Sequence, residues 1–281
     1  MTLVYLNGDY LAAEDAKISP FDRGFLFGDG VYEVIPVFGG KPFRLAEHLD
    51  RLDYSLAQIG MENPLGRDQW QAIFARLGAD VATPDQSIYL QITRGAPLQR
   101  DHRFPENTAP TVFVYAKPIA SPSLEPQAGI ACITAPDWRW QRCDIKSTSL
   151  LGSILPSEQA ASANAREAIL IRDGMAFEGA SSNVFAVIDG VLRTAPKNRY
   201  LLGGITRDVV VELLAQHSDI AFSEQAFTEA ELRAASEVWI SSSTREILPV
   251  IVLDGVAVGS GAVGDIYKRV WALYVAFRQS L

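Results

Sequence analysis

Five two-residue turn signals constrain the fold of this chain more than any other feature. Asn7-Gly8, Gly39-Gly40, Asp173-Gly174, Asp189-Gly190 and Asp254-Gly255 each separate two short runs of mainly apolar residues. Both residues of such a dipeptide tolerate positive φ, which a two-residue β-hairpin turn requires. The sequence therefore predicts a mainly antiparallel sheet.

Helical patterns lie between these hairpins. Leu45, Leu49, Leu52, Leu56 and Ile59 repeat at helical spacing, and Gly60 then ends the run. Further helices are expected over residues 68–78, 156–168, 206–217 and 265–281, with Pro156 in the first turn of its helix or at a kink. Sheets with segregated helices predict an α+β protein.

A segment poor in apolar residues divides the chain. Residues 117–129 contain three prolines and two serines, which is typical of a linker. With 281 residues the chain is long enough for two domains. We therefore expect an N-terminal domain over 1–118, a linker over 119–124 and a C-terminal domain over 125–281.

Composition excludes several classes of protein. The formal net charge is -8 and no run is rich in Lys or Arg, which argues against nucleic acid as a partner. No signal peptide is evident, and no apolar run approaches the roughly 20 residues of a membrane span. Cys132 and Cys143 form no CxxC, which fits the cytoplasm. His48, His102 and His217 form no metal-binding pattern, so no metal is expected.

Lys146 is the first candidate for chemistry. It lies just before a mostly apolar run of small residues in "RCDIKSTSLLGSIL", residues 142–155. A lysine at a strand end can extend its amine to water while its stem packs on apolar surface. A desolvated lysine instead has a lowered pKa and can form a Schiff base. The residues around it leave both interpretations open.

Four other features could act with Lys146, and each also has a purely structural interpretation. Glu178 ends a strand before a tight connection of small residues, although a surface carboxylate there is ordinary. Gly203-Gly204 precede a helix opened by Ile205 and Thr206, which suits an anion or a simple N-cap. Residues 241–244 are all hydroxylic and suit a phosphate or a turn. Arg51 lies beside the apolar stripe of its helix and could simply be solvated.

Taken together, these segments resemble one known family. The sequence is similar to the fold-type IV pyridoxal-phosphate enzymes, which include D-amino acid and branched-chain aminotransferases and aminodeoxychorismate lyase. The segments that carry the resemblance occur in the family's order and span nearly the whole chain: "FDRGFLFGDGVYEVIPVF", "EHLDRL", "RCDIKSTSLLGSIL", "EGASSNVF", "GGITRD" and "SSSTREILPV". Within the family, the closest similarity is to the D-amino acid transaminases. The resemblance implies a smaller N-terminal domain and a larger C-terminal domain with a barrel-like, mainly antiparallel sheet.

The resemblance implies pyridoxal 5'-phosphate (PLP) as the cofactor and gives each candidate a role. Lys146 binds the cofactor covalently and moves a proton at the substrate Cα, and Glu178 keeps the pyridine nitrogen protonated. Leu202 packs on the ring. The full cofactor-binding set that the resemblance implies is Arg51, Lys146, Glu178, Ser181, Ser182, Leu202, Gly204, Ile205, Thr206, Ser242 and Ser243.

The substrate assignment rests on the loop "TRGAPLQRDHRFP". Arg100 and His102, two residues apart on one side of an extended segment, present donors suited to a carboxylate. By the resemblance, this pair and Tyr32 bind the α-carboxylate, and the loop serves the neighbouring subunit of a homodimer. The loop is one residue longer than the family pattern, Ala180 stands in place of a serine, and Ser243 stands in place of a threonine.

These expectations converge on a cytoplasmic, homodimeric D-amino acid transaminase that uses amino acid and 2-oxo acid substrates. The alternatives within the same fold are transamination of branched-chain L-amino acids or of (R)-amines, and aminodeoxychorismate lyase. The Arg100/His102 pair weighs against all three. A non-catalytic PLP carrier would need Lys146 without proton-handling partners, and Glu178 argues against it.

Overall fold

The computed structural model describes residues 2–216 and 219–280, so His217 and the last residue of the helix expected over 265–281 lie outside it. The chain divides into two compact units, Met1–Pro122 with Ile145–Leu150, and Ser123–Asp144 with Leu151–Leu281. The division falls between Pro122 and Ser123, and residues 145–150 return to the first unit.

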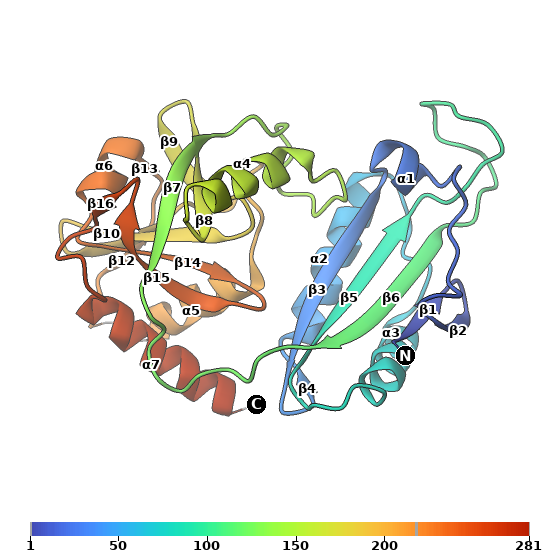
Figure 1. Cartoon of the computed structure of the whole chain (residues 1–281), viewed down its shortest axis with the longest axis horizontal. Coiled ribbons are helices and arrows are strands. Elements are labelled where there is room, and N and C mark those ends of the chain that lie inside the picture. The colour runs from blue at the N-terminus through green and yellow to red at the C-terminus, as the bar shows by residue number, and fades with distance from the viewer. Residues whose placement is uncertain (1, 217–218, 281) are drawn as a thin grey trace. The chain divides into compact units, whose positions relative to one another are not determined.

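The first unit is an antiparallel sheet with helices on one face (Figure 1). Strand order is β2-β1-β6-β5-β3-β4. Side chains of α2 and α3 share one core with Val31 and Ile35 of β3, whereas Tyr32 points to the opposite face because strand residues alternate. The elements are β1 (Leu3–Leu6), β2 (Asp9–Ala12), α1 (Arg23–Phe27), β3 (Gly30–Phe38), β4 (Lys41–Pro42), α2 (Leu45–Gln58), α3 (Arg67–Gly78), β5 (Gln86–Thr93) and β6 (Thr111–Pro118).

The second unit is built on a sheet that closes on itself. Six strands follow one another in the order β10-β14-β15-β7-β8-β9, and β9 pairs again with β10 through Glu178 and Asn183. Most pairs are antiparallel, but β7 runs parallel to both β8 and β15. The elements are β7 (Ile130–Pro136), α4 (Leu151–Ser162), β8 (Glu167–Arg172), β9 (Met175–Gly179), β10 (Asn183–Ile188), β11 (Val191–Thr194), α5 (Ile205–Gln216), β12 (Phe222–Glu224), β13 (Phe227–Thr228), α6 (Glu229–Ala234), β14 (Glu237–Ser242), β15 (Glu246–Leu253), β16 (Val256–Ala257) and α7 (Asp265–Gln279).

The predicted α+β class and barrel-like sheet are confirmed, and so are all five hairpins. Each dipeptide joins two antiparallel strands, and the φ of Asp173 and Gly174 are +51° and +76°. Both lie in the left-handed region that a two-residue hairpin turn needs. In the described part of the chain, no helix is long and apolar enough to cross a membrane.

One predicted helix was misplaced. The segment expected to be helical over 156–168 forms α4 from Leu151 to Ser162, and Glu167 already begins β8. Pro156 was expected in the first turn or at a kink, because proline has no N–H for the hydrogen bonds of later turns. It lies inside the helix, in the second turn of α4, and is buried.

Candidate active site

Lys146 lies in the first unit, held between β3 and α2. The Tyr32 N–H donates to the Lys146 carbonyl (3.0 Å), and the Lys146 N–H donates to Ser55 Oγ in α2 (3.2 Å). Its Nζ lies 4.0 Å from the centre of the Tyr32 ring, a cation–π distance. The structure thus brings together the predicted catalytic lysine and the tyrosine predicted to bind substrate.

Arg51 is fixed by a glutamate that the sequence did not single out. Its Nε and Nη2 donate to the two oxygens of Glu33, at 2.7 and 2.8 Å. His48 Nδ1 lies 2.8 Å from Glu33 Oε2, and both His48 and Glu33 are fully buried. The signal was present, because Glu33 falls at a core position of the apolar strand between Val31 and Ile35.

The electrostatics of this cluster follow from its burial. Burial alone would raise the pKa of Glu33, but the charge and hydrogen bonds of Arg51, helped by His48, hold that pKa well below its usual range. Burial lowers the pKa of His48 although Glu33 opposes the shift, so the imidazole is neutral at pH 7. The cluster is therefore a carboxylate–guanidinium pair with a neutral imidazole beside it.

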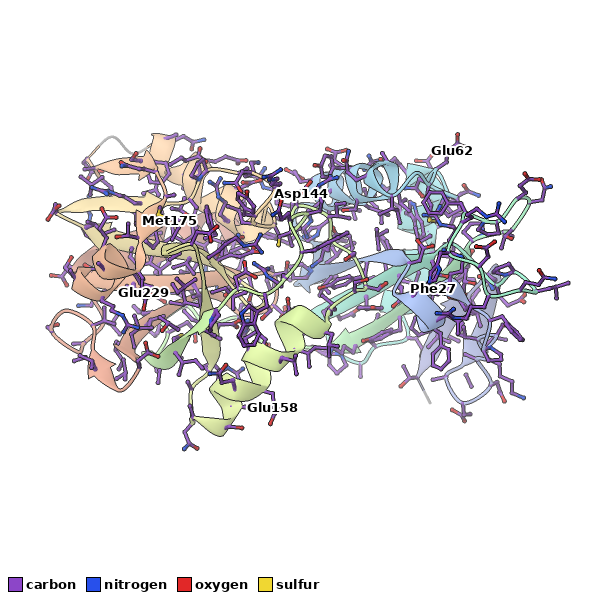
Figure 2. All side chains as sticks on the ribbon, turned by 90° about the horizontal axis from the view of Figure 1, so that it is seen from above. Phe27, Glu62, Asp144, Glu158, Met175 and Glu229 are labelled. Carbon is purple, nitrogen blue, oxygen red and sulfur yellow. The ribbon has the colours of Figure 1, made fainter. Side chains whose placement is uncertain are left out.

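Arg100 and His102 gather around one aromatic ring. The ring belongs to Phe27, at the end of α1 (Figure 2). Arg100 Cζ lies 4.8 Å from the centre of this ring, and the centre of the His102 ring lies 5.4 Å from it. Residues 94–110, which include both side chains, form a loop without a strand. Both side chains are exposed.

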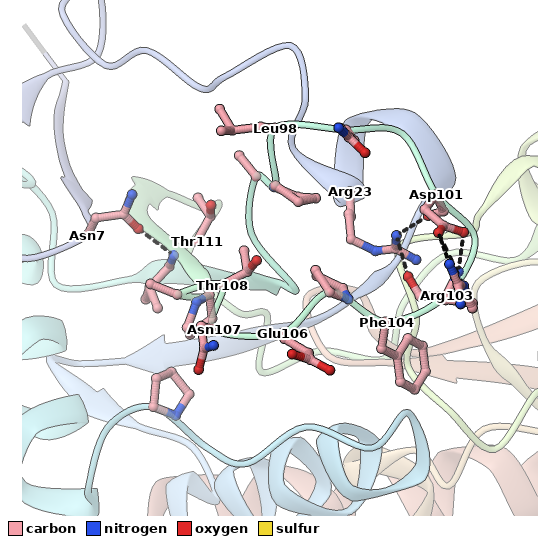
Figure 3. Close-up of a pocket in the computed structure, with 18 of the residues that line it drawn as sticks. Asn7, Arg23, Leu98, Asp101, Arg103, Phe104, Glu106, Asn107, Thr108 and Thr111 are labelled. Atoms are coloured by element: carbon pink, nitrogen blue, oxygen red, sulfur yellow. Dashed lines mark hydrogen bonds and ion pairs between the residues drawn. The ribbon is translucent and has the colours of Figure 1, made fainter.

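The loop that carries them is held through its backbone. Arg23, itself buried, donates to the carbonyls of Asp101 and Arg103 (Figure 3). It also donates to the His102 carbonyl. The loop also lines a cavity of about 1280 Å³, whose wall includes neither Lys146 nor Tyr32. Lys146 therefore does not line this cavity.

Glu178 lies in the second unit, in the strand pair that closes the barrel. Its Oε1 accepts from Arg139 Nη1 (2.6 Å) and its Oε2 from the Leu202 N–H (2.9 Å). Arg139 in turn donates from Nε and Nη2 to the two carboxylate oxygens of Asp137, at 2.9 Å each. No sequence pattern pointed to Arg139 or Asp137, because their role depends on contacts distant along the chain.

Burial sets the protonation of Glu178. It raises the pKa of the carboxyl to about 7, although the Arg139 charge and the Leu202 hydrogen bond work against the shift. A carboxyl poised near neutrality can hold or release a proton at cellular pH. A protonated ring nitrogen placed beside it would favour the ionised form.

The start of α5 and the turn after β14 form a cup of potential phosphate-binding groups. The helix begins at Ile205, directly after Gly203-Gly204, and Thr206 Oγ1 donates to the Ser242 carbonyl at the end of β14 (3.3 Å). A Cβ on Gly204 would lie 2.0 Å from Asn183 Oδ1, so only glycine fits there. The side-chain amide of Asn183 also donates to the Leu202 carbonyl (2.8 Å), which fixes the backbone of Leu202.

The serines near Glu178 differ in how they are used. Ser181 donates to Glu167 and accepts from Arg245 Nη2 (2.8 Å). The buried hydroxyls of Ser182 and Ser241 make no hydrogen bond with any other described residue. Nothing around them in the described part of the chain explains these two unpaired hydroxyls. The buried Glu178 carboxyl fits the ring nitrogen of PLP, and the cup fits its phosphate.

Comparison with known proteins gives the family. The family described as "Amino-transferase class IV" matches residues 30–252. The D-alanine aminotransferase of Staphylococcus epidermidis is 41% identical over 281 residues, covering 100% of this chain and 99% of that protein. The D-alanine aminotransferase of Bacillus licheniformis is 41% identical over 268 residues, covering 95% and 94%.

Solved structures agree on the fold. The branched-chain amino acid aminotransferase of Escherichia coli matches with a TM-score of 0.86 and 27% identity, covering 96% of this chain and 92% of that one. The enzyme of Thermoproteus uzoniensis matches with a TM-score of 0.84 and 26% identity, covering 97% and 93%. The resemblance drawn from the ordered motifs is confirmed, and this chain belongs to the class IV aminotransferases.

Proposed function

We propose that this protein is a PLP-dependent transaminase that moves the amino group of a D-amino acid, such as D-alanine, to 2-oxoglutarate or pyruvate by a ping-pong mechanism. The observation that carries the proposal is the 41% identity to D-alanine aminotransferases along the whole chain. Arg100 and His102 support it, because both side chains lie beside the Phe27 ring and both are donors suited to an α-carboxylate.

When bound, PLP serves as the electron sink for bond breaking at the substrate Cα. Lys146 would hold the cofactor covalently and then move the proton at Cα. Glu178 would keep a proton on the pyridine nitrogen, since its carboxylate is buried and fixed by Arg139 and Leu202. Tyr32, Arg100 and His102 would orient the substrate through its carboxylate.

The remaining site residues would bind and orient the cofactor. Phosphate oxygens would be met by the first turn of α5, at Ile205 and Thr206, where free N–H groups and the helix dipole favour an anion. Ser242, Ser243 and Arg51 would complete the phosphate site. Gly204 permits the close packing on Asn183 that fixes Leu202, which would pack on the ring. Ser181 and Ser182 would join the hydrogen-bond network.

We further propose a homodimer in the cytoplasm. On α4, Leu151, Ile154 and Leu155 share one face, and their exposed fractions are 67, 56 and 57%. An exposed apolar helix face of this kind commonly marks a protein interface. Both cysteines are unpaired thiols, which suits a reducing compartment.

The proposal is tested by a half-reaction without an acceptor. Purified protein is mixed separately with D-alanine, L-leucine and an (R)-amine, and the cofactor's visible absorption band is followed. Discharge of the band by D-alanine alone supports the proposal, and Lys146→Ala should abolish both the band and turnover. Discharge by L-leucine would indicate a branched-chain enzyme, the activity named for the structural neighbours. A band that none of the three discharges, with release of pyruvate from aminodeoxychorismate, would indicate the lyase.

A further inference from the structure

The turn that follows β14 contains a backbone conformation that its sequence does not favour. Ser242 pairs with Glu246 across a three-residue loop, and Glu246 has a φ of +55°. Three-residue hairpins normally place a residue in the left-handed region at this point, and glycine adopts it without strain. A non-glycine residue keeps such a conformation only where its surroundings impose it.

The surroundings of Glu246 are a buried polar cluster on the C-terminal helix α7. Arg278 Nη1 donates to Glu246 Oε1, and the two side chains are only 4 and 5% exposed. Arg278 Nη2 also donates to the Ser123 carbonyl (2.7 Å). The carboxylate is therefore anchored from outside the hairpin to which it belongs.

The same cluster extends to the phosphate cup. Tyr274, fully buried one turn before Arg278 on α7, interacts with both Glu246 and Thr206. Thr206 in turn donates to the Ser242 carbonyl at the other end of the turn. Glu246 and Thr206 thus bracket residues 242–244, and α7 contacts both of them.

From this geometry we infer that Glu246 and Arg278 are positioning residues, which hold the Ser242–Thr244 turn against the start of α5 so that its hydroxyls and N–H groups converge on a phosphate. The inference rests on the proposed function, because the phosphate belongs to the cofactor. Neither residue needs to touch the cofactor. The strained backbone at Glu246 is retained because a glycine there would remove the carboxylate that Arg278 holds.

The test compares PLP with pyridoxal, which lacks the phosphate. Dissociation constants of both ligands are measured by fluorescence titration of the cofactor-free, full-length protein, for the wild type and for Glu246→Gln, Glu246→Gly and Arg278→Lys. We expect each variant to bind PLP about tenfold more weakly while its affinity for pyridoxal changes less than about threefold. A general loosening of the unit would instead weaken both ligands alike, and that result would overturn the inference.

The variants separate the two components of the argument. Glu246→Gly removes the charge but relieves the backbone, so it remains informative if Arg278→Lys fails to fold. If Glu246→Gly folds and keeps the wild-type affinity for PLP, the carboxylate is not needed and the inference is wrong. Arg269→Gln is the control on the same helix, since it deletes the exposed ion pair of α7 with Asp219, which includes neither Tyr274, Glu246 nor Arg278. It should leave the ratio of the two affinities unchanged.

Failure of the proposed function gives a different result. If the wild-type protein binds neither PLP nor pyridoxal, the cofactor assignment fails and the positioning role fails with it. If the wild type binds PLP far more tightly than pyridoxal and the variants keep that preference, only the positioning role is refuted.

Discussion

At the scale of single residues, Glu178 combines burial with a charged neighbour. Its pKa is raised to about 7 by burial, against the opposing charge of Arg139. In the unfolded chain the same carboxyl titrates near its ordinary value, about 4.3. Between these two pH values, Glu178 is therefore protonated in the folded, cofactor-free protein but ionised in the unfolded chain.

This difference predicts a pH-dependent stability. Stability from the protonated carboxyl is fully present below about pH 4.3 and is lost as the pH rises towards 7. Relative to Glu178→Gln, the cofactor-free wild type should lose about 3 kcal/mol of unfolding free energy over that range. Urea denaturation at several pH values measures it. A constant difference between the two proteins would show that the carboxyl titrates normally.

Glu33 should behave in the opposite way. Its pKa is lowered, so its stabilising ion pair with Arg51 is present above about pH 4.3 and is lost as the pH falls through the folded-state pKa. We expect Glu33→Gln to cost about 3 kcal/mol at pH 7, because it leaves Arg51 without its buried counter-charge, and less at pH 3. Glu47→Gln is the control, since its pair with Arg44 is partly exposed and should contribute less than about 1 kcal/mol. Equal losses in both variants would refute the buried-pair argument.

At the scale of elements, the sequence was most informative where structure is local. The turn Asp173-Gly174 correctly predicts its hairpin, and the leucine spacing from Leu45 correctly predicts α2. Both structures depend mainly on residues that are close along the chain. The start of α4 was not predicted, since the short run over residues 150–155 before Pro156 shows no clear helical period. The partners of the site residues were also missed: Glu33 and Arg139 contact Arg51 and Glu178 across 18 and 39 positions.

The loop over residues 94–110 yields a prediction at this scale. Arg23→Met removes the donors that hold three of its carbonyls, so Arg100 and His102 lose their fixed position. The KM for D-alanine should rise about tenfold, with kcat and PLP affinity much less affected, because the proposed role of the loop is to bind the substrate carboxylate and not the cofactor. Steady-state kinetics measures this, and Arg23→Lys should restore part of the loss. Arg103→Met, whose side chain is 89% exposed, should have no effect. An unchanged KM in Arg23→Met would place the substrate elsewhere.

At the scale of the whole molecule, the two units carry different parts of the predicted site. The first holds Lys146, Tyr32 and Arg51, and the second holds Glu178 and the cup. The sequence placed Lys146 in the C-terminal domain because position along the chain was its only guide. Residues 145–150 return to the first unit through a β-bridge between Val31 and Ser147. No local sequence pattern predicts this long-range pairing.

The assembly supplies the last prediction. Leu155→Glu places a charge on the exposed apolar face of α4, and a charge buried in an interface without a partner is costly. We expect the variant to be monomeric and the wild type dimeric by size-exclusion chromatography with light scattering. Val256→Glu changes a residue that is 67% exposed on the β15–β16 hairpin, and it should remain dimeric. A dimeric Leu155→Glu variant would mean that another surface forms the contact.

The way in which Arg23 holds its loop has a consequence for how new specificities could arise. Its three acceptors are main-chain carbonyls, which every amino acid possesses. The side chains of residues 100–103 can therefore be exchanged without losing the hydrogen bonds to Arg23. The backbone path of the loop can stay the same while its side chains change. Grafting a different loop sequence between the same ends is thus the most direct route to a relative of this protein with another choice of substrate.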